Sequence, residues 1–101
     1  MRMLMNVNLP HEPFNTYVKD GSVGRRMNDI LNELKPEAVY FTETNGRRNV
    51  ILVVDLENPS QIPVLAEPWF LAFEAEVRFQ VVMSPEELQA SGIDKIGNKW
   101  S

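Results

Sequence analysis

Alternating apolar and polar positions at the start of the chain predict a β-strand over residues 1–9. Met3, Met5, Val7 and Leu9 share one face of this strand, and the opposite face is mostly polar. Pro10 ends it, because proline has no backbone N–H to donate to a neighbouring strand. The strand is therefore expected to place one face on the core and to leave the other half polar.

Helical spacing replaces this alternation over residues 11–34. Apolar residues three and four apart predict a short helical piece within residues 11–20, with Gly21 as its stop. Ser22 stands where a helix cap is expected. Residues 23–34 then carry an apolar stripe at i, i+4, i+7, i+8 and i+11, which predicts an amphipathic helix that ends at Lys35-Pro36.

A hairpin follows at Asn45-Gly46, the dipeptide that best suits a tight type I′ turn. It joins strands predicted at residues 38–44 and 47–56, and its two-residue loop sets their register. The five aliphatic residues from Val50 to Val54 indicate a strand that is buried on both faces. Helices can cover one face, but the chain has no spare element for the other, so we expect a partner subunit to cover it.

The second half of the chain predicts a helix, a strand and a short terminal helix. Asn58-Pro59 is the expected helix start, and Pro68 is expected to kink the helix or end it early. A strand is predicted over residues 74–83. Ser84-Pro85-Glu86-Glu87 forms a capping box that opens a C-terminal helix, which Gly92 should stop, and a tail runs on to Ser101.

These elements give the order βαββαβ, which is typical of the ferredoxin-like plan within the α+β class. We predict a four-stranded antiparallel sheet with strand order 4-1-3-2 and with helices on one face. At 101 residues the chain suits a single domain. Its core is expected in residues 1–83, and the C-terminal helix and tail in residues 84–101.

Composition narrows the classes of function. The chain has no Cys and a single His, which excludes disulfides, thiolate ligands and a multi-histidine metal site within one protomer, so we expect no metal and no cofactor. The net charge of −4 disfavours non-specific binding to nucleic acid or anionic lipid. The N-terminus is too polar for a signal peptide, and no apolar run is long enough for a membrane span, so a cytoplasmic location is expected.

The sheet face away from the helices is the candidate functional site. It is expected to collect polar and apolar side chains from all strands, namely Asn6, Asn8, Tyr40, Thr42, Asn49, Ile51, Asp55, Glu76, Arg78 and Gln80. Such a mixed surface, covered by a second protomer, has the make-up of a ligand cavity. The ligand-binding candidates are Asn6, Asn8, Tyr40, Thr42 and Arg78.

Within this set, Arg78 is expected to bind an acidic group of a small organic ligand. Tyr40 and the asparagines would orient that ligand, and Glu76 would act as acid or base. His11 is the second catalytic candidate, because it follows the first strand and could reach the mouth of the cavity. The alternative interpretation is structural: Glu76 and Arg78 are solvated charges that protect an edge strand, and His11 is a loop residue.

Two aromatic patterns bear on partners. RNA-recognition domains share this strand order but stack bases on aromatic residues of the third strand, and Val50 to Val54 contains none, so nucleic acid is not an expected partner. Trp100 is a large aromatic residue near a terminus, and such a residue needs a surface to cover, either on its own domain or on a neighbour.

Three stretches resemble the dimeric α/β-barrel superfamily, and within it small uncharacterised bacterial proteins: Pro10 to Asn15, Lys35 to Phe41 and Ala66 to Phe70. The resemblance implies a homodimer whose two sheets face each other. The superfamily includes cofactor-free monooxygenases, isomerases and haem-degrading enzymes. Haem is not expected here, because such a site would require an axial His on a helix and His11 is predicted to lie in a loop.

The mixed polarity of the sheet face and the absence of any catalytic set lead to two functional hypotheses. One is a small-molecule-binding barrel, with monooxygenase-like or isomerase-like activity as its enzymatic form. The other is a non-catalytic dimeric domain with a structural or regulatory role. The absence of a catalytic motif matching the superfamily leaves both open.

Overall fold

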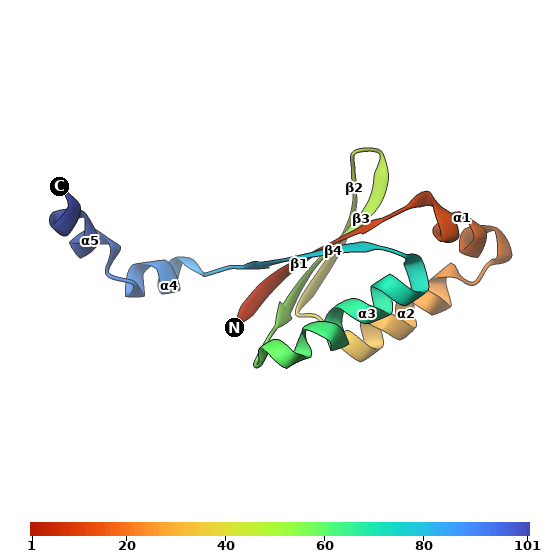
Figure 1. The fold of residues 1–101 in the computed structure, drawn as a ribbon, viewed down its shortest axis with the longest axis horizontal. Coiled ribbons are helices and arrows are strands. Elements are labelled where there is room, and N and C mark those ends of the chain that lie inside the picture. The colour runs from red at the N-terminus through yellow and green to blue at the C-terminus, as the bar shows by residue number, and fades with distance from the viewer.

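The computed structural model describes all residues from Met1 to Ser101 and has the predicted ferredoxin-like plan (Figure 1). The strands of its single sheet are β1 (Arg2–Leu9), β2 (Ala38–Thr44), β3 (Arg47–Asp55) and β4 (Glu76–Val81). They lie in the order β2-β3-β1-β4, and every neighbouring pair is antiparallel, which confirms the predicted order 4-1-3-2.

Helices cover one face of this sheet. The long ones are α2 (Val23–Leu34) and α3 (Ile62–Phe73), which lie side by side beneath the strands (Figure 1). A shorter helix, α1 (His11–Asp20), follows β1 directly, and a single 3-10 turn, η1 (Pro59–Gln61), leads into α3. The prediction that the helices lie on one face is confirmed, and the opposite sheet face is left open.

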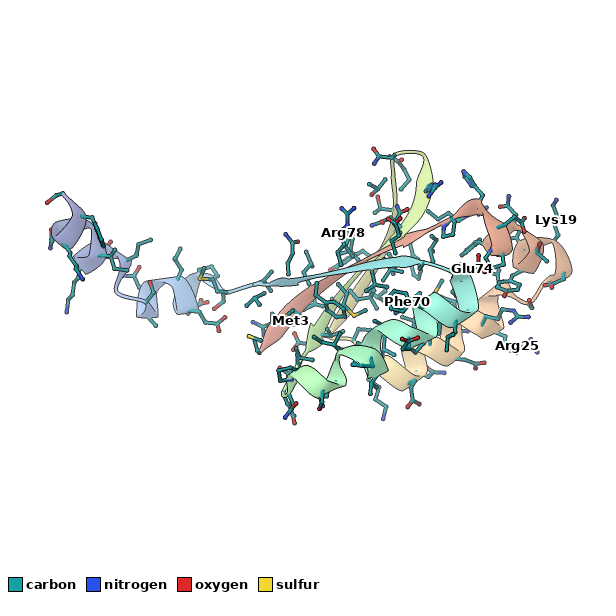
Figure 2. All side chains as sticks on the ribbon, viewed as in Figure 1. Met3, Lys19, Arg25, Phe70, Glu74 and Arg78 are labelled. Carbon is teal, nitrogen blue, oxygen red and sulfur yellow. The ribbon has the colours of Figure 1, made fainter.

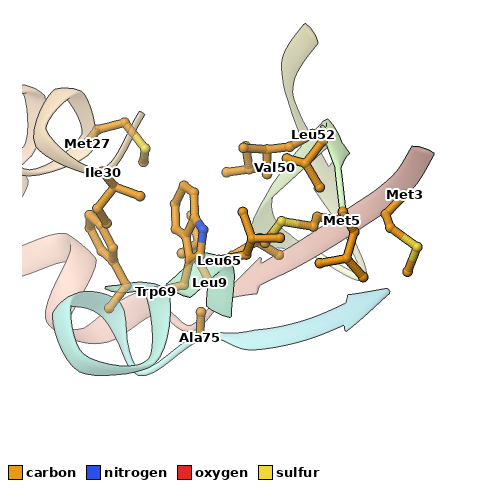
Figure 3. Packing of buried hydrophobic residues seen from close by; sticks show 14 residues of the cluster. Met3, Met5, Leu9, Met27, Ile30, Val50, Leu52, Leu65, Trp69 and Ala75 are labelled. Atoms are coloured by element: carbon orange, nitrogen blue, oxygen red, sulfur yellow. The ribbon is translucent and has the colours of Figure 1, made fainter. Parts of the chain in front are cut away.

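The core lies between the sheet and these helices (Figure 3). Met5, Leu9 and Leu52 from the strands are almost completely buried against Trp69 and Phe73 of α3. The alternation of the strand sequences explains this arrangement, since every second side chain of β1 and β3 points toward the helices. The same alternation sends the intervening residues to the open face.

The open face has two halves, which we define by the register of the strands. One cross-strand row joins Ala38, Val53, Leu4 and Gln80, and the next joins Tyr40, Ile51, Asn6 and Arg78. A third row joins Thr42, Asn49, Asn8 and Glu76. Apolar side chains therefore gather at the end of the sheet that holds the N-terminus of β1, whereas polar side chains gather toward the β2–β3 hairpin.

Of the two outcomes predicted for Pro68, a kink or an early end of the helix, the structure excludes the early end. The helix continues past this proline to Phe73, although proline removes one backbone hydrogen bond and costs about 3 kcal/mol in a helix interior. Trp69 and Phe73 lie beyond Pro68 and are fully buried, and burying large side chains of this kind contributes about 1.5–3 kcal/mol each. Their burial offsets the loss at the proline, so the helix does not end there.

Ser22 occupies the predicted position before α2 but makes no side-chain cap hydrogen bond. Its hydroxyl oxygen instead accepts a hydrogen bond from the Arg26 side chain, and its backbone N–H donates to Asp20. The Ser22 side chain, and after it the Ser22 backbone N–H, hold the pKa of the Asp20 carboxyl below its usual range. The Ser84 capping box, by contrast, is present as predicted.

The C-terminal residues form an arm that projects from the domain (Figure 1). We call residues 82–101 the C-terminal arm; it contains α4 (Pro85–Ala90) and α5 (Ile93–Trp100). The sequence predicted one C-terminal helix followed by a tail after Gly92, whereas residues 93–100 form a second helix. Gly92 takes a left-handed conformation, with φ 77°, that ends the first helix and starts the second. No helix in the molecule is both long and apolar enough to cross a bilayer.

Candidate functional site

A polar hollow of about 280 Å³ lies on the open sheet face, next to the β2–β3 hairpin. None of its lining residues is hydrophobic; they are Asn6, Asn8, Thr44, Asn45, Arg47, Asn49, Glu76 and Arg78. Strands β1, β3 and β4 supply most of these side chains, and the hairpin supplies the rest. Figure 2 shows Arg78 on the side of the sheet away from the helices.

An asparagine ladder forms the floor of this hollow. The Asn8 side-chain amide donates to Asn49 Oδ1 at 3.2 Å, and the Asn49 amide donates to Asn6 Oδ1 at 2.8 Å. Asn49 is only 1% exposed and is the one buried polar residue of the chain. Because a buried amide is stable only when its polar atoms are bonded, Asn6 and Asn8 hold Asn49 in a defined orientation.

The ladder has a direction, and this direction gives the hollow two chemically different ends. Its hydrogen bonds use the Asn6 carbonyl oxygen and leave the Asn6 NH₂ group without a protein partner. At the other end, they use the Asn8 NH₂ group and leave the Asn8 carbonyl oxygen without one. One end of the ladder therefore offers hydrogen-bond donors and the other end offers an acceptor.

Strand β4 adds a charge of matching character at each end. Arg78 lies opposite Asn6 in the register, and Glu76 lies opposite Asn8. The donor end therefore combines a guanidinium with an amide NH₂, which suits an anion. The acceptor end combines a carboxylate with an amide oxygen, which suits a hydroxyl or an ammonium group. Residues two apart on a strand are about 7 Å apart, so the two ends are separated by roughly the length of a small molecule.

The positive side chains of the hollow have no internal partners. The ion pairs of the protein involve only the N-terminal ammonium and Arg2, and neither Arg47 nor Arg78 donates a hydrogen bond to another residue. Arg26 and Arg48, by contrast, stack on aromatic rings. Arg47 and Arg78 are therefore the guanidinium groups of this face whose donors are available to a ligand.

The structure brings together part of the predicted site. Asn6, Asn8, Glu76 and Arg78 line the hollow. Tyr40 and Thr42 share the open face but lie outside the lining, on the edge strand β2. His11 is exposed at the first position of α1, ahead of Glu12, whose backbone is extended with φ −109° and ψ 138°; it therefore precedes the regular part of the helix, and it does not line the hollow.

Four lining residues were absent from both the ligand-binding and the catalytic candidates: Thr44, Asn45, Arg47 and Asn49. Three of them lie at the hairpin, where the Asn-Gly signal was interpreted only as a turn. The alternation of β3 did place Asn49 on this face, but its burial depends on neighbours in two strands. No group of three His, Asp or Glu side chains comes close enough together to hold a metal ion.

Comparison with known proteins adds little. No family model matches the chain, and no curated protein matches it. Among solved structures, the chain is similar to the de novo designed protein Ferredog-Diesel, with a TM-score of 0.48 and 12% sequence identity over 80% of this chain and 85% of that one.

Proposed function

We propose that the polar hollow binds a small organic acid that also carries a hydrogen-bond donor, such as a hydroxy acid or an amino acid. The observation that carries this proposal is the asparagine ladder with Arg78 at its donor end and Glu76 at its acceptor end. The carboxylate of the ligand would bind Arg78 and the Asn6 amide. Its hydroxyl or ammonium group would donate to Glu76 and to the Asn8 carbonyl oxygen.

The proposal includes a homodimer of the dimeric α/β-barrel type, located in the cytoplasm, in which a second copy covers the open face. The apolar half of that face supports this part. Leu4, Ile51 and Val53 are only half-buried in one chain, although they come from the two central strands of the sheet. Covering them would remove apolar surface from water and would also enclose the hollow, which strengthens the bonds of its charged groups.

Glu76 determines what chemistry such a site could perform. It is the only carboxylate that lines the hollow, so a proton transfer to or from the bound acid would use it. This is the form that an isomerase-like activity would take. The non-catalytic alternative, in which the face serves only assembly, is supported by the same half-buried apolar residues and predicts that no acid binds.

The test uses three matched probes that differ by one group each: 3-hydroxybutyrate, butyrate and 3-hydroxybutyramide. Binding is followed by NMR through the side-chain amide signals of Asn6 and Asn49. We expect 3-hydroxybutyrate to bind most tightly, because it alone satisfies both ends. Arg78→Gln should weaken it about 10- to 100-fold, the effect of losing a charged hydrogen bond of about 1.5–3 kcal/mol.

Glu76→Gln should instead reduce the preference for 3-hydroxybutyrate over butyrate, because it weakens the acceptor end and leaves Arg78 in place. Lys99→Gln and Glu86→Gln are the matched controls, since they make the same charge changes in the exposed C-terminal arm. Equal affinity for 3-hydroxybutyrate and 3-hydroxybutyramide would refute the proposal that Arg78 binds the carboxylate of the ligand. If no probe shifts the side-chain amide signal of Asn49, the result would favour the non-catalytic alternative, in which the open face serves only assembly.

A further inference from the structure

The C-terminal arm carries an apolar stripe that its own chain leaves uncovered. In α5, Ile93, Ile96 and Trp100 follow one another at i, i+3 and i+7, so they lie on one face of the helix. All three are exposed, and Trp100 is 76% exposed. A terminal helix with exposed apolar side chains at helical spacing has the properties of a segment that packs against another surface.

The contacts at the base of the arm direct it away from its own domain. The Val82 N–H donates to the Arg2 carbonyl at 3.3 Å, which extends the path of β4. The capping box of Ser84 and Glu87 then sets the start of α4, and the Glu87 carboxylate lies 4.0 Å from the Arg2 guanidinium. The arm therefore runs on past the end of the sheet (Figure 1).

The opposite edge of the sheet has a matching unprotected surface. Strand β2 is an edge strand, and its aromatic residues Tyr40 and Phe41 are 65% and 60% exposed. Phe41 points to the helix side of the sheet and Tyr40 to the open side, so each side of this edge carries an exposed aromatic ring. Proteins commonly cover such an edge with a helix or loop, because an exposed edge strand invites uncontrolled pairing.

Opposite charges are present on the two surfaces. Residues 37–44 carry two carboxylates and no basic residue; Glu37 pairs with the Arg2 guanidinium at 3.3 Å, and Glu43 accepts a hydrogen bond from the Gly46 N–H. Helix α5 carries Lys95 and Lys99 against the single acid Asp94. An α5 helix that packs along β2 would therefore bring lysines toward glutamates while it covers the aromatic residues.

We infer that the C-terminal arm of one copy of this chain docks on edge strand β2 of a second copy, with Trp100 and Ile96 against Phe41. The arm cannot reach its own β2, because β1 and β3 lie between β4 and β2 and the arm leaves in the outward direction. Each copy has both a donor arm and an acceptor edge. A two-fold exchange therefore satisfies both surfaces in both copies, as closed homodimers do. This inference goes beyond the proposed ligand and does not depend on it.

Disulfide trapping tests this docking, and the absence of cysteine from the chain makes it free of background. A protein with Trp100→Cys is mixed with a protein with Phe41→Cys, mild oxidant is added, and the mixed disulfide dimer is measured by intact mass. Any such product joins two copies. We expect it to be the main heterodimer and to form at least several times faster than in the controls.

Two controls use equally exposed positions. In the first control, a protein with Asn98→Cys is used in place of the Trp100→Cys protein; Asn98 lies on the other side of the same helix. In the second, a protein with Leu71→Cys is used in place of the Phe41→Cys protein; Leu71 lies on the helix layer and is 80% exposed. Faster trapping with Leu71→Cys would place the arm on α3 and overturn the inference. Equal rates for all pairs would also overturn it, because random collisions would then explain the products.

A measurement without cysteines provides an independent check. Trp69 is fully buried, so acrylamide quenching of tryptophan fluorescence reports mainly on Trp100. We expect Trp100 to become protected from acrylamide as protein concentration rises, and Ile96→Glu to abolish this protection. Quenching that does not change with concentration in the wild type would overturn the inference. Ile96→Glu should leave probe binding in the hollow intact, which separates failure of the arm from failure of the ligand site.

Discussion

Substitutions at Asn49 and Leu52 test whether ligand binding on the open face can be lost while the stability of the sheet is kept. Both residues lie on β3 and are almost completely buried, but Asn49 faces the hollow and Leu52 faces the core. The perturbation is a reciprocal pair of variants, Asn49→Leu and Leu52→Asn. One variant replaces an amide side chain with leucine, and the other makes the reverse replacement.

The structure sets the expected magnitudes. Asn49→Leu removes two hydrogen bonds, worth about 0.5–1.5 kcal/mol each, while a buried leucine returns about 1.5–3 kcal/mol. Asn6 and Asn8 are half-exposed, so water can satisfy the atoms that lose their partner. The net change in the free energy of unfolding should therefore lie within about 2 kcal/mol of zero. Leu52→Asn removes a buried leucine side chain and places an amide in the apolar core, which should lower the free energy of unfolding by about 3–5 kcal/mol.

Urea unfolding measures both values, at one fixed protomer concentration because a dimer would make stability depend on it. We expect the Asn49→Leu midpoint to stay close to that of the wild type and the Leu52→Asn midpoint to fall well below it. Binding of 3-hydroxybutyrate should nevertheless be lost in Asn49→Leu. A loss of more than about 3 kcal/mol in Asn49→Leu would refute this reasoning, because the ladder would then be needed to hold the sheet together.

Two further predictions concern the backbone and pH. Gly46→Ala should destabilise the protein by about 1–2 kcal/mol, because Gly46 has φ 78° in the hairpin and a side chain is strained there. Gly24→Ala, in the exposed part of α2, should instead stabilise the protein by about 0.5–1 kcal/mol. Thermal unfolding measures both variants, and equal effects on stability would refute the role of φ. The pKa of Glu87 is held below its ordinary value, first by the Ser84 backbone N–H and then by the Ser84 side chain. Its stabilisation of the arm is therefore present above the pKa of the unfolded state and is lost as pH falls through the lower folded value. An NMR titration of the Ser84 amide should show this loss, Glu87→Gln should abolish it, and a Ser84 amide that does not change in acid would contradict the prediction.

The sequence alone was sufficient to predict the sheet and its strand order, but it left open which face of strands β2 and β3 the helices cover. Alternation in β1 and β4 assigns each of their residues to one of two faces, and the Asn45-Gly46 turn sets the register between β2 and β3, so a local pattern determines a long-range pairing. The same alternation predicts that the lining residues of β1 and β4 share one face of the sheet, which the hollow confirms. Strand order followed because the βαββαβ sequence has a well-known antiparallel solution.

Tertiary structure decided the features that depend on contacts between distant residues. Pro68 lies inside a continuous helix because Trp69 and Phe73 are buried on the far side of it, and no local propensity contains that information. The hollow includes Asn49 and hairpin residues because three asparagines from two strands come within hydrogen-bond distance. The base of the arm likewise meets the other end of the chain, where the Arg2 carbonyl accepts a hydrogen bond from the Val82 N–H and the Arg2 guanidinium lies 4.0 Å from the Glu87 carboxylate. Local patterns specify which way a side chain points, whereas the packing of separate elements specifies what it meets.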